Sequence, residues 1–144
     1  MIRTSIVLGL MFSLSAFAVE GSWVGEGRTT VGREISKCEA VTVNVTRAEG
    51  KLILGYNFTC GEEAYEHECV TDVDDLGVIS HEGQPIGIIT PFALHISKVS
   101  ADYSGSVDIT STFHHANFHS THVKDNVVTT RHAFLTVDQE DENE

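Results

Sequence analysis

The sequence predicts an all-β fold, a single up-and-down antiparallel β-barrel of about eight to ten strands. Short runs rich in Val, Ile, Thr, Phe and Tyr are separated by Gly, Asn and Asp at short intervals. Several of these runs alternate apolar and polar residues, which is the pattern of strands that bury one face. No segment of useful length has the periodicity of an amphipathic helix.

The N-terminus has the features of a secretory signal peptide over residues 1–18. Arg3 precedes an apolar run over residues 6–14, and Ala16 and Ala18 form an A-x-A cleavage site. The apolar run is too short to cross the roughly 30 Å of bilayer hydrocarbon as a helix. We therefore expect cleavage after Ala18, a secreted or periplasmic location, and a single β-barrel domain over residues 19–137.

The chain is strongly acidic, with 21 Asp and Glu, 9 Lys and Arg, and a formal net charge of −12. This charge repels phosphate backbones and anionic lipid headgroups, so the sequence argues against binding to nucleic acids and to membrane surfaces. Beyond the N-terminal apolar run no segment approaches the length of a membrane span, so we expect no membrane insertion. Residues 138–144 contain five of the acidic residues and almost nothing apolar. We expect them to form a disordered acidic tail.

The clearest hairpin of the sequence joins residues 41–46 to residues 52–58. The first run alternates apolar and polar residues, and a two-residue turn at residues 49–50 connects it to the second run. This turn places Val45 opposite Leu54 and keeps one face of both strands apolar. We expect that face to point into the barrel.

The next connection, over residues 61–64, is expected to return the chain along the same sheet. It would place Phe58 opposite His67 and Cys60 opposite Tyr65. Tyr65 and His67 then share the inward face with Phe58. Further strands are expected over residues 77–80, 85–90 and 92–99.

A two-residue turn at residues 125–126 organises the C-terminal hairpin. It pairs His122 with Thr129 and Ser120 with Arg131. The apolar residues of both strands fall on the same face as His122 and Arg131. We therefore expect these two polar side chains to point inward.

A second turn, through residues 114–117, is expected to precede this hairpin. It would pair Phe113 with Phe118 and Ile109 with His122. Phe113 would then lie on the inward face together with Phe118.

The stretch GSWVGEG at residues 21–27 holds the single Trp of the chain. A G-x-W on the first strand of an antiparallel barrel resembles the calycin group, which includes the lipocalins and the fatty-acid-binding and avidin-like barrels. The resemblance implies that Trp23 closes the barrel floor and stacks on an Arg of the last strand, here Arg131, in a cation–π contact. Gly25 and Gly27 share a face with Trp23, and we expect them to let the strand coil as the barrel closes.

A barrel of this size has room for packed side chains or for one small ligand. We expect an apolar cavity with a few polar groups, which is the usual form of a small-molecule site. The sequence thus predicts an exported barrel that binds a small apolar ligand without catalysis. In an alternative interpretation the core is filled and the acidic surface binds a protein partner. The expected ligand-binding residues are Leu54, Tyr56, Phe58, Tyr65, His67, Leu94, Phe113, Phe118 and His122; Leu52, Phe92 and Leu135 are also expected to point inward.

Eight histidines suggest a further alternative, a metal-binding or haem-binding barrel. The expected register places His119 directly opposite His132 on the outer face, with His115 in the adjacent turn. Cross-strand side chains lie about 5 Å apart, so the two imidazoles can share a zinc or copper ion. The longer motif G-x-W-x-G-x-G also resembles the nitrobindin-like haem barrels, and this resemblance implies His132 as the iron ligand.

The chain has three cysteines, Cys38, Cys60 and Cys69. The expected register places Cys38 one step from Cys60, so we expect these two to form a disulfide and Cys69 to remain a thiol. A bond between Cys60 and Cys69 is the alternative, and it needs the intervening segment to be a loop. The sequence has no G-x-S-x-G motif and no Gly-rich phosphate loop, which argues against an enzyme.

Overall fold

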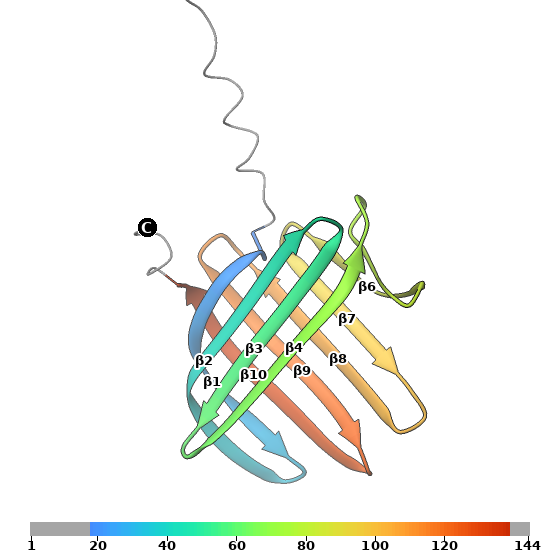
Figure 1. The fold of residues 1–144 in the computed structure, drawn as a ribbon. Helices are drawn as coiled ribbons and strands as arrows, with labels where there is room; N and C mark the ends of the chain where they lie inside the picture. Colours follow the sequence, from blue (N-terminus) through green and yellow to red (C-terminus); the bar gives the residue numbers. More distant parts are fainter. Residues whose placement is uncertain (1–17, 139–144) are drawn as a thin grey trace, which may run out of the picture.

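The computed structural model describes residues 18–138 of the chain. Ten antiparallel strands follow one another in these residues, and β1 also pairs with β10, so that the sheet closes into a barrel (Figure 1). The expected all-β, up-and-down architecture is confirmed. The expected signal peptide, apart from Ala18, and most of the acidic tail lie outside the described residues. The strands are β1 (Gly21–Val31), β2 (Glu34–Ala48), β3 (Lys51–Cys60), β4 (Glu63–Val73), β5 (Val78–His81), β6 (Gln84–Thr90), β7 (Ala93–Val99), β8 (Tyr103–Ser111), β9 (His115–Lys124) and β10 (Val127–Val137).

Two hairpins have the register that the sequence predicts. Val45 faces Leu54 across β2 and β3, and β9 pairs with β10 through the expected turn. Residues 49–50 have φ angles of 54° and 75°, and residues 125–126 have φ angles of 52° and 63°. Two consecutive left-handed residues give the turn a twist that matches the twist of the strands. Within residues 18–138, no helix is long and apolar enough to cross a membrane.

The expected register between β3 and β4 is wrong by one two-residue step. Phe58 faces Tyr65 rather than His67, and His67 faces Tyr56. The connection is a two-residue turn because Gly61 adopts a left-handed φ of 66° and reverses the chain directly. A shift of two residues preserves the face of each side chain, so Tyr65 and His67 still point inward.

The expected register between β8 and β9 is also wrong, because the chain leaves β8 before it reaches Phe113. Ile109 faces Phe118, and the hydroxyl oxygen of Thr112 accepts hydrogen bonds from the backbone N–H groups of His114 and His115 at 3.3 and 3.1 Å. Such a hydroxyl cap stabilises a turn at the expense of the strand. Phe113 is consequently 69 % exposed instead of inward. Phe92 is also exposed, and its ring centroid lies 5.3 Å from that of Phe113.

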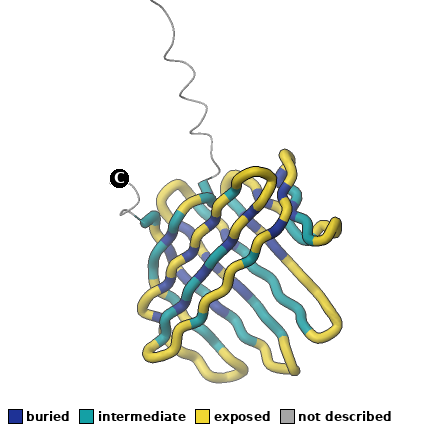
Figure 2. The backbone as a smooth tube through the Cα atoms, in the orientation of Figure 1, coloured by how far each residue is buried: buried dark blue, intermediate teal, exposed yellow. Residues whose placement is uncertain are grey.

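The fully buried side chains come from strands all around the barrel (Figure 2). Phe58 and Phe118 contact each other with ring centroids 5.5 Å apart. Each large side chain buried in such a core contributes about 1.5–3 kcal/mol to folding. We call the following set the packed core: Trp23, Leu52, Phe58, Leu94, Ile109, Phe118 and Leu135.

Trp23 lies at the end of the barrel where the chain enters, but its expected stacking on Arg131 is wrong. The indole N–H donates to the carbonyl oxygen of Val19 at 3.1 Å. Across β1 and β10, Trp23 faces Val137, whereas Arg131 faces Thr29. Six residues of a strand span about 20 Å, so the indole and the guanidinium are too far apart to touch.

Gly25 and Gly27 let β1 approach β10 more closely than any side chain would allow. A Cβ atom at Gly25 would lie 2.0 Å from the carbonyl oxygen of Phe134, and one at Gly27 would lie 2.1 Å from that of His132. The pairing of β1 with β2 also shifts between these two glycines, as in a β-bulge. The closing contact between the first and last strands therefore depends on both glycines.

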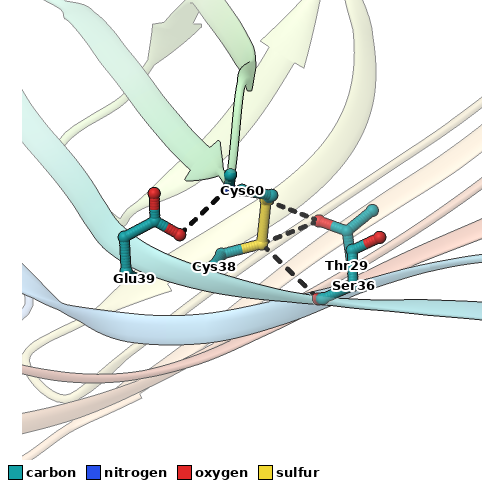
Figure 3. The surroundings of a disulfide bond; sticks show 6 residues. Thr29, Ser36, Cys38, Glu39 and Cys60 are labelled. Carbon is teal, nitrogen blue, oxygen red and sulfur yellow. Dashed lines mark hydrogen bonds between the residues drawn. A yellow bond between two sulfur atoms is a disulfide. The ribbon is translucent and has the colours of Figure 1, made fainter.

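The expected disulfide joins Cys38 of β2 to Cys60 at the end of β3 (Figure 3). Beside it, a carboxylate oxygen of Glu39 accepts a hydrogen bond from the N–H of Gly61 at 3.1 Å. This hydrogen bond is the main cause that lowers the pKa of Glu39. The disulfide joins residues 22 positions apart in the sequence, which corresponds to a stabilisation of about 3 kcal/mol in the chain-entropy description.

The ladder between β4 and β5 is much shorter than the others. Only Asp72 with Ser80 and Val73 with Ile79 pair across it. On its other side β4 pairs with β3 along the whole length of that strand. Among the described strands, residues 63–71 therefore have a partner on one side only, and we call this short ladder the seam.

Candidate ligand-binding site

The barrel interior contains a cavity of about 540 Å³ beside the seam. Its walls come from β3 and β4 on one side of the seam, from β5, β6 and β7 on the other, and from the facing strands β8, β9 and β10. A volume of this size suits a small organic molecule. The expected residues that line it are Leu54, Tyr56, Tyr65, His67 and His122.

The other expected lining residues lie elsewhere. Phe58, Leu94 and Phe118 are buried, but they belong to the packed core and do not border the cavity. Phe113 is exposed in the turn between β8 and β9. The inward direction was thus predicted for three of these four side chains, but the position of the cavity along the barrel was not.

Arg131 is the central charged group of the cavity. Its side chain projects inward from β10, and the residue is only 8 % exposed. The guanidinium carbon lies 3.5 Å from the centroid of the Tyr65 ring, a cation–π contact. The ion pairs among residues 18–138 do not include Arg131, and its Nε has no hydrogen-bond partner. A buried charge without a counter-ion is costly in a folded protein.

Further polar atoms without partners surround the same cavity. Buried side-chain atoms without a hydrogen bond occur at six described residues, and four of these residues line the cavity. Buried polar groups are normally paired with protein, water or ligand atoms. The cavity therefore offers its contents several unused hydrogen-bonding groups. These groups are Thr71 Oγ1, Ser120 Oγ, His122 Nε2 and Arg131 Nε.

The titratable side chains around Arg131 favour their uncharged forms. Burial raises the pKa of Tyr56 and, to a lesser degree, that of Tyr103. Burial lowers the pKa of both His67 and His122, and the positive charge of Arg131 adds to this effect. His67 lines the cavity although the residue itself is exposed. At neutral pH these four groups are therefore neutral, and Arg131 gives the cavity a positive interior.

Several lining residues were not identified from the sequence. Tyr103, Ile96 and Thr71 are examples, and all three lie on strands whose mutual register the sequence did not predict. Ser120 could have been identified from the sequence, because its predicted pairing with Arg131 already placed it on the inward face. The free thiol of Cys69 also lines the cavity, and burial raises its pKa.

Three histidines of the C-terminal hairpin, His115, His119 and His132, do not line the cavity. His119 faces His132 as expected, and their ring centroids are 6.1 Å apart. His115 faces Thr136 and belongs to β9 rather than to the turn. Because His132 alternates with the inward Arg131 and Ala133, it points away from the interior. It cannot reach the iron of a haem held in this cavity.

The fold and the cavity define a class of protein, a closed up-and-down antiparallel β-barrel with an internal cavity. No protein-family model matches the sequence, and no curated protein matches it. Among solved structures, the chain is similar to one described by the words "The Siderocalin Ex-FABP functions through dual ligand specificities". The TM-score is 0.43 and the identity is 14 %, over 85 % of this chain and 75 % of that chain.

Proposed function

We propose that this protein is an exported barrel that binds one small, mainly apolar molecule and carries it without changing it chemically. The observation that carries the proposal is Arg131, a buried cation without a counter-ion in the wall of a 540 Å³ cavity. Leu54, Ile86, Ile96 and Val107 would contact the apolar body of the ligand.

The polar end of this ligand is an anionic group, and Arg131 is its counter-ion. Ser120 and His122 lie on the strand that pairs with β10, and both have an unused hydrogen-bonding atom beside the cavity. A carboxylate or sulfonate accepts several such hydrogen bonds at once. Leaving one member of a buried, hydrogen-bonded charge pair alone costs about 2–5 kcal/mol, so an anion gains correspondingly from Arg131.

Export is part of the same proposal. A disulfide such as Cys38–Cys60 is typical of oxidising compartments, where a carrier would meet its ligand. The size of the cavity argues against the alternative in which side chains fill the interior.

Two fluorescent probes that differ in charge test the proposal. The anion 1-anilinonaphthalene-8-sulfonate and the uncharged N-phenyl-1-naphthylamine have the same aromatic skeleton. We expect both to bind the folded protein. Arg131→Gln is expected to weaken binding of the anion by about tenfold or more and to leave the uncharged probe within about twofold. Arg33→Gln, an exposed arginine in the turn between β1 and β2, is the matched control and is expected to change neither.

A second variant tests the cavity itself. Val107→Trp is expected to fill part of the space and to weaken both probes, with far-UV circular dichroism confirming the fold. The proposal is wrong if the native barrel binds neither probe. It is also wrong if Arg131→Gln leaves anion binding intact.

A further inference from the structure

A row of chemically similar side chains crosses the outer face of the barrel at one level. His95 of β7 faces Asp108 of β8, and Asp108 faces His119 of β9. His119 faces His132 of β10, and His132 faces Arg28 of β1. Side chains directly opposite one another on antiparallel strands have Cβ atoms about 5 Å apart. The fold thus brings four metal-ligating side chains from four separate stretches of sequence into one continuous row.

We propose that His119, His132 and Asp108 bind one Zn²⁺ or Cu²⁺ ion on the outer face of the barrel. Imidazole and carboxylate are ligands that both ions accept, and three protein ligands leave one position for water. This site is separate from the cavity, because all three side chains alternate with inward residues of their strands. The proposal is independent of the proposed carrier function.

The spacing of the two histidines is close to that of a chelating pair. Two imidazoles on one tetrahedral ion, with metal–nitrogen bonds of about 2.0–2.1 Å, have ring centroids about 5 Å apart. The centroids of His119 and His132 are 6.1 Å apart. His119 is exposed and His132 is half-buried, so a rotation of the His119 ring that closes about 1 Å would bring the two rings to the spacing of a chelating pair.

Asp108 is the third ligand, and His95 positions it. The Nδ1 atom of His95 and one carboxylate oxygen of Asp108 are 2.5 Å apart, and both side chains are about half exposed. The second carboxylate oxygen is free to turn toward His119. A hydrogen bond from outside the coordination sphere is the usual way in which proteins orient a ligating carboxylate.

The site has to form on metal binding. With the side chains as they stand, no group of three or more His, Cys, Asp or Glu within residues 18–138 surrounds a metal position. The required movements are side-chain rotations on a rigid sheet, so their cost is small. Arg28 lies beside His132 and repels a cation, which keeps the expected affinity in the micromolar range.

His115 provides a matched control. It lies on the same strand and the same outer face as His119, but four residues away, or about 13 Å along the strand. It therefore tests whether any histidine of this hairpin is sufficient for binding or whether membership in the row is required.

Isothermal titration of the untagged, folded protein with ZnCl₂ and with CuCl₂ tests the site. We expect one ion per chain, and we expect His119→Ala and His132→Ala each to weaken binding by about tenfold or more. Asp108→Asn is expected to weaken it by about tenfold, and His115→Ala by less than about twofold. Arg28→Ala is expected to strengthen binding several-fold, which mere loss of structure cannot do.

The proposal is overturned if the native protein binds neither ion with a Kd below about 100 µM. It is equally overturned if His115→Ala matters as much as His132→Ala. Far-UV circular dichroism confirms that each variant is folded. Arg131→Gln is expected to keep metal binding, so failure of the carrier function and failure of this site are distinguishable.

Discussion

The packed core and the cavity occupy the same barrel, yet their side chains have opposite relations to stability. In the packed core, residues such as Trp23 and Phe118 are apolar and fully buried. Around the cavity, Arg131 and Ser120 are just as inaccessible but have polar atoms without partners. Burial alone therefore does not identify what a residue contributes. The packed core stabilises the fold, whereas the unpartnered polar groups around the cavity lower its stability and are available to a ligand.

The largest contrast is expected between Trp23 and Ser120. Trp23→Ala is expected to lower the free energy of unfolding by about 3–5 kcal/mol, because it removes the largest buried side chain and leaves a cavity. Ser120→Ala is expected to change it by less than about 1 kcal/mol, because its hydroxyl has no partner to lose. Urea unfolding followed by far-UV circular dichroism measures both changes. Trp fluorescence is unsuitable, because Trp23 is the only Trp of the chain and Trp23→Ala removes it. Equal losses in the two variants would contradict the contrast.

The disulfide is expected to stabilise the barrel at the hairpin that precedes β4. Replacing both Cys38 and Cys60 with Ser is expected to lower the free energy of unfolding by about 3 kcal/mol. Thermal unfolding with and without reductant measures the effect, and the double variant is expected to be insensitive to reductant. Cys69→Ser is the control and is expected to leave the midpoint nearly unchanged. A loss below about 1 kcal/mol in the double variant would show that the register alone holds these strands.

Arg131→Met sharpens the comparison from the side of the cavity. It replaces a buried cation without a counter-ion by an apolar side chain, so the free energy of unfolding is expected to rise by about 1 kcal/mol without ligand. The same change is expected to abolish the preference for the anionic probe. Denaturant unfolding measures the first effect and fluorescence titration the second. A loss of more than about 2 kcal/mol would mean that the contact with Tyr65 makes Arg131 a structural residue.

The smallest effect is expected from pH. Burial and Arg131 lower the pKa of His67 and His122 in the folded chain below the reference value of 6.5. The unfolded chain thus binds more protons just below pH 6.5, and stability is expected to fall as the pH drops through that window. A bound anion favours the protonated imidazoles, so affinity for the sulfonate probe is expected to rise about threefold as the pH falls from 7.5 to 5.5.

Titrating the uncharged probe in parallel separates this effect from changes of the whole fold. Its affinity is expected to stay constant or to decrease over the same pH range. The double variant His67→Asn with His122→Asn is expected to remove the pH dependence of sulfonate binding. If that dependence survives, other groups are responsible for it.

The sequence predicted what depends on neighbouring residues and failed where distant parts of the barrel decide. The turns at residues 49–50 and 125–126 are two-residue turns between alternating strands, so their register follows from local pattern alone. The turn before His115 depends on the hydroxyl of Thr112, which caps the turn and ends the strand. The alternation of apolar and polar residues does not predict this hydrogen bonding. The positions of Trp23 and Arg131 along the barrel depend on how β1 and β10 are staggered. That stagger follows from closure of the whole sheet, so neighbouring residues in the sequence could not show whether Trp23 and Arg131 meet.

The position of the cavity was beyond reach of the sequence for the same reason. Alternation identifies which side chains point inward, but it does not tell which inward side chains meet others across the barrel. Phe58 and Phe118 meet and fill the space between them, whereas Tyr56 and Arg131 border space that remains open.

The seam between β4 and β5 is expected to open more readily than the rest of the sheet. Separating the two residue pairs of the seam disturbs a far smaller part of the sheet than unfolding does, so it occurs at much lower free energy. Amide protons of residues 63–71 are therefore expected to exchange with solvent faster than those of β3. Local openings of this kind occur in microseconds to milliseconds, and under the proposed carrier function they would let a bound molecule leave without loss of the fold.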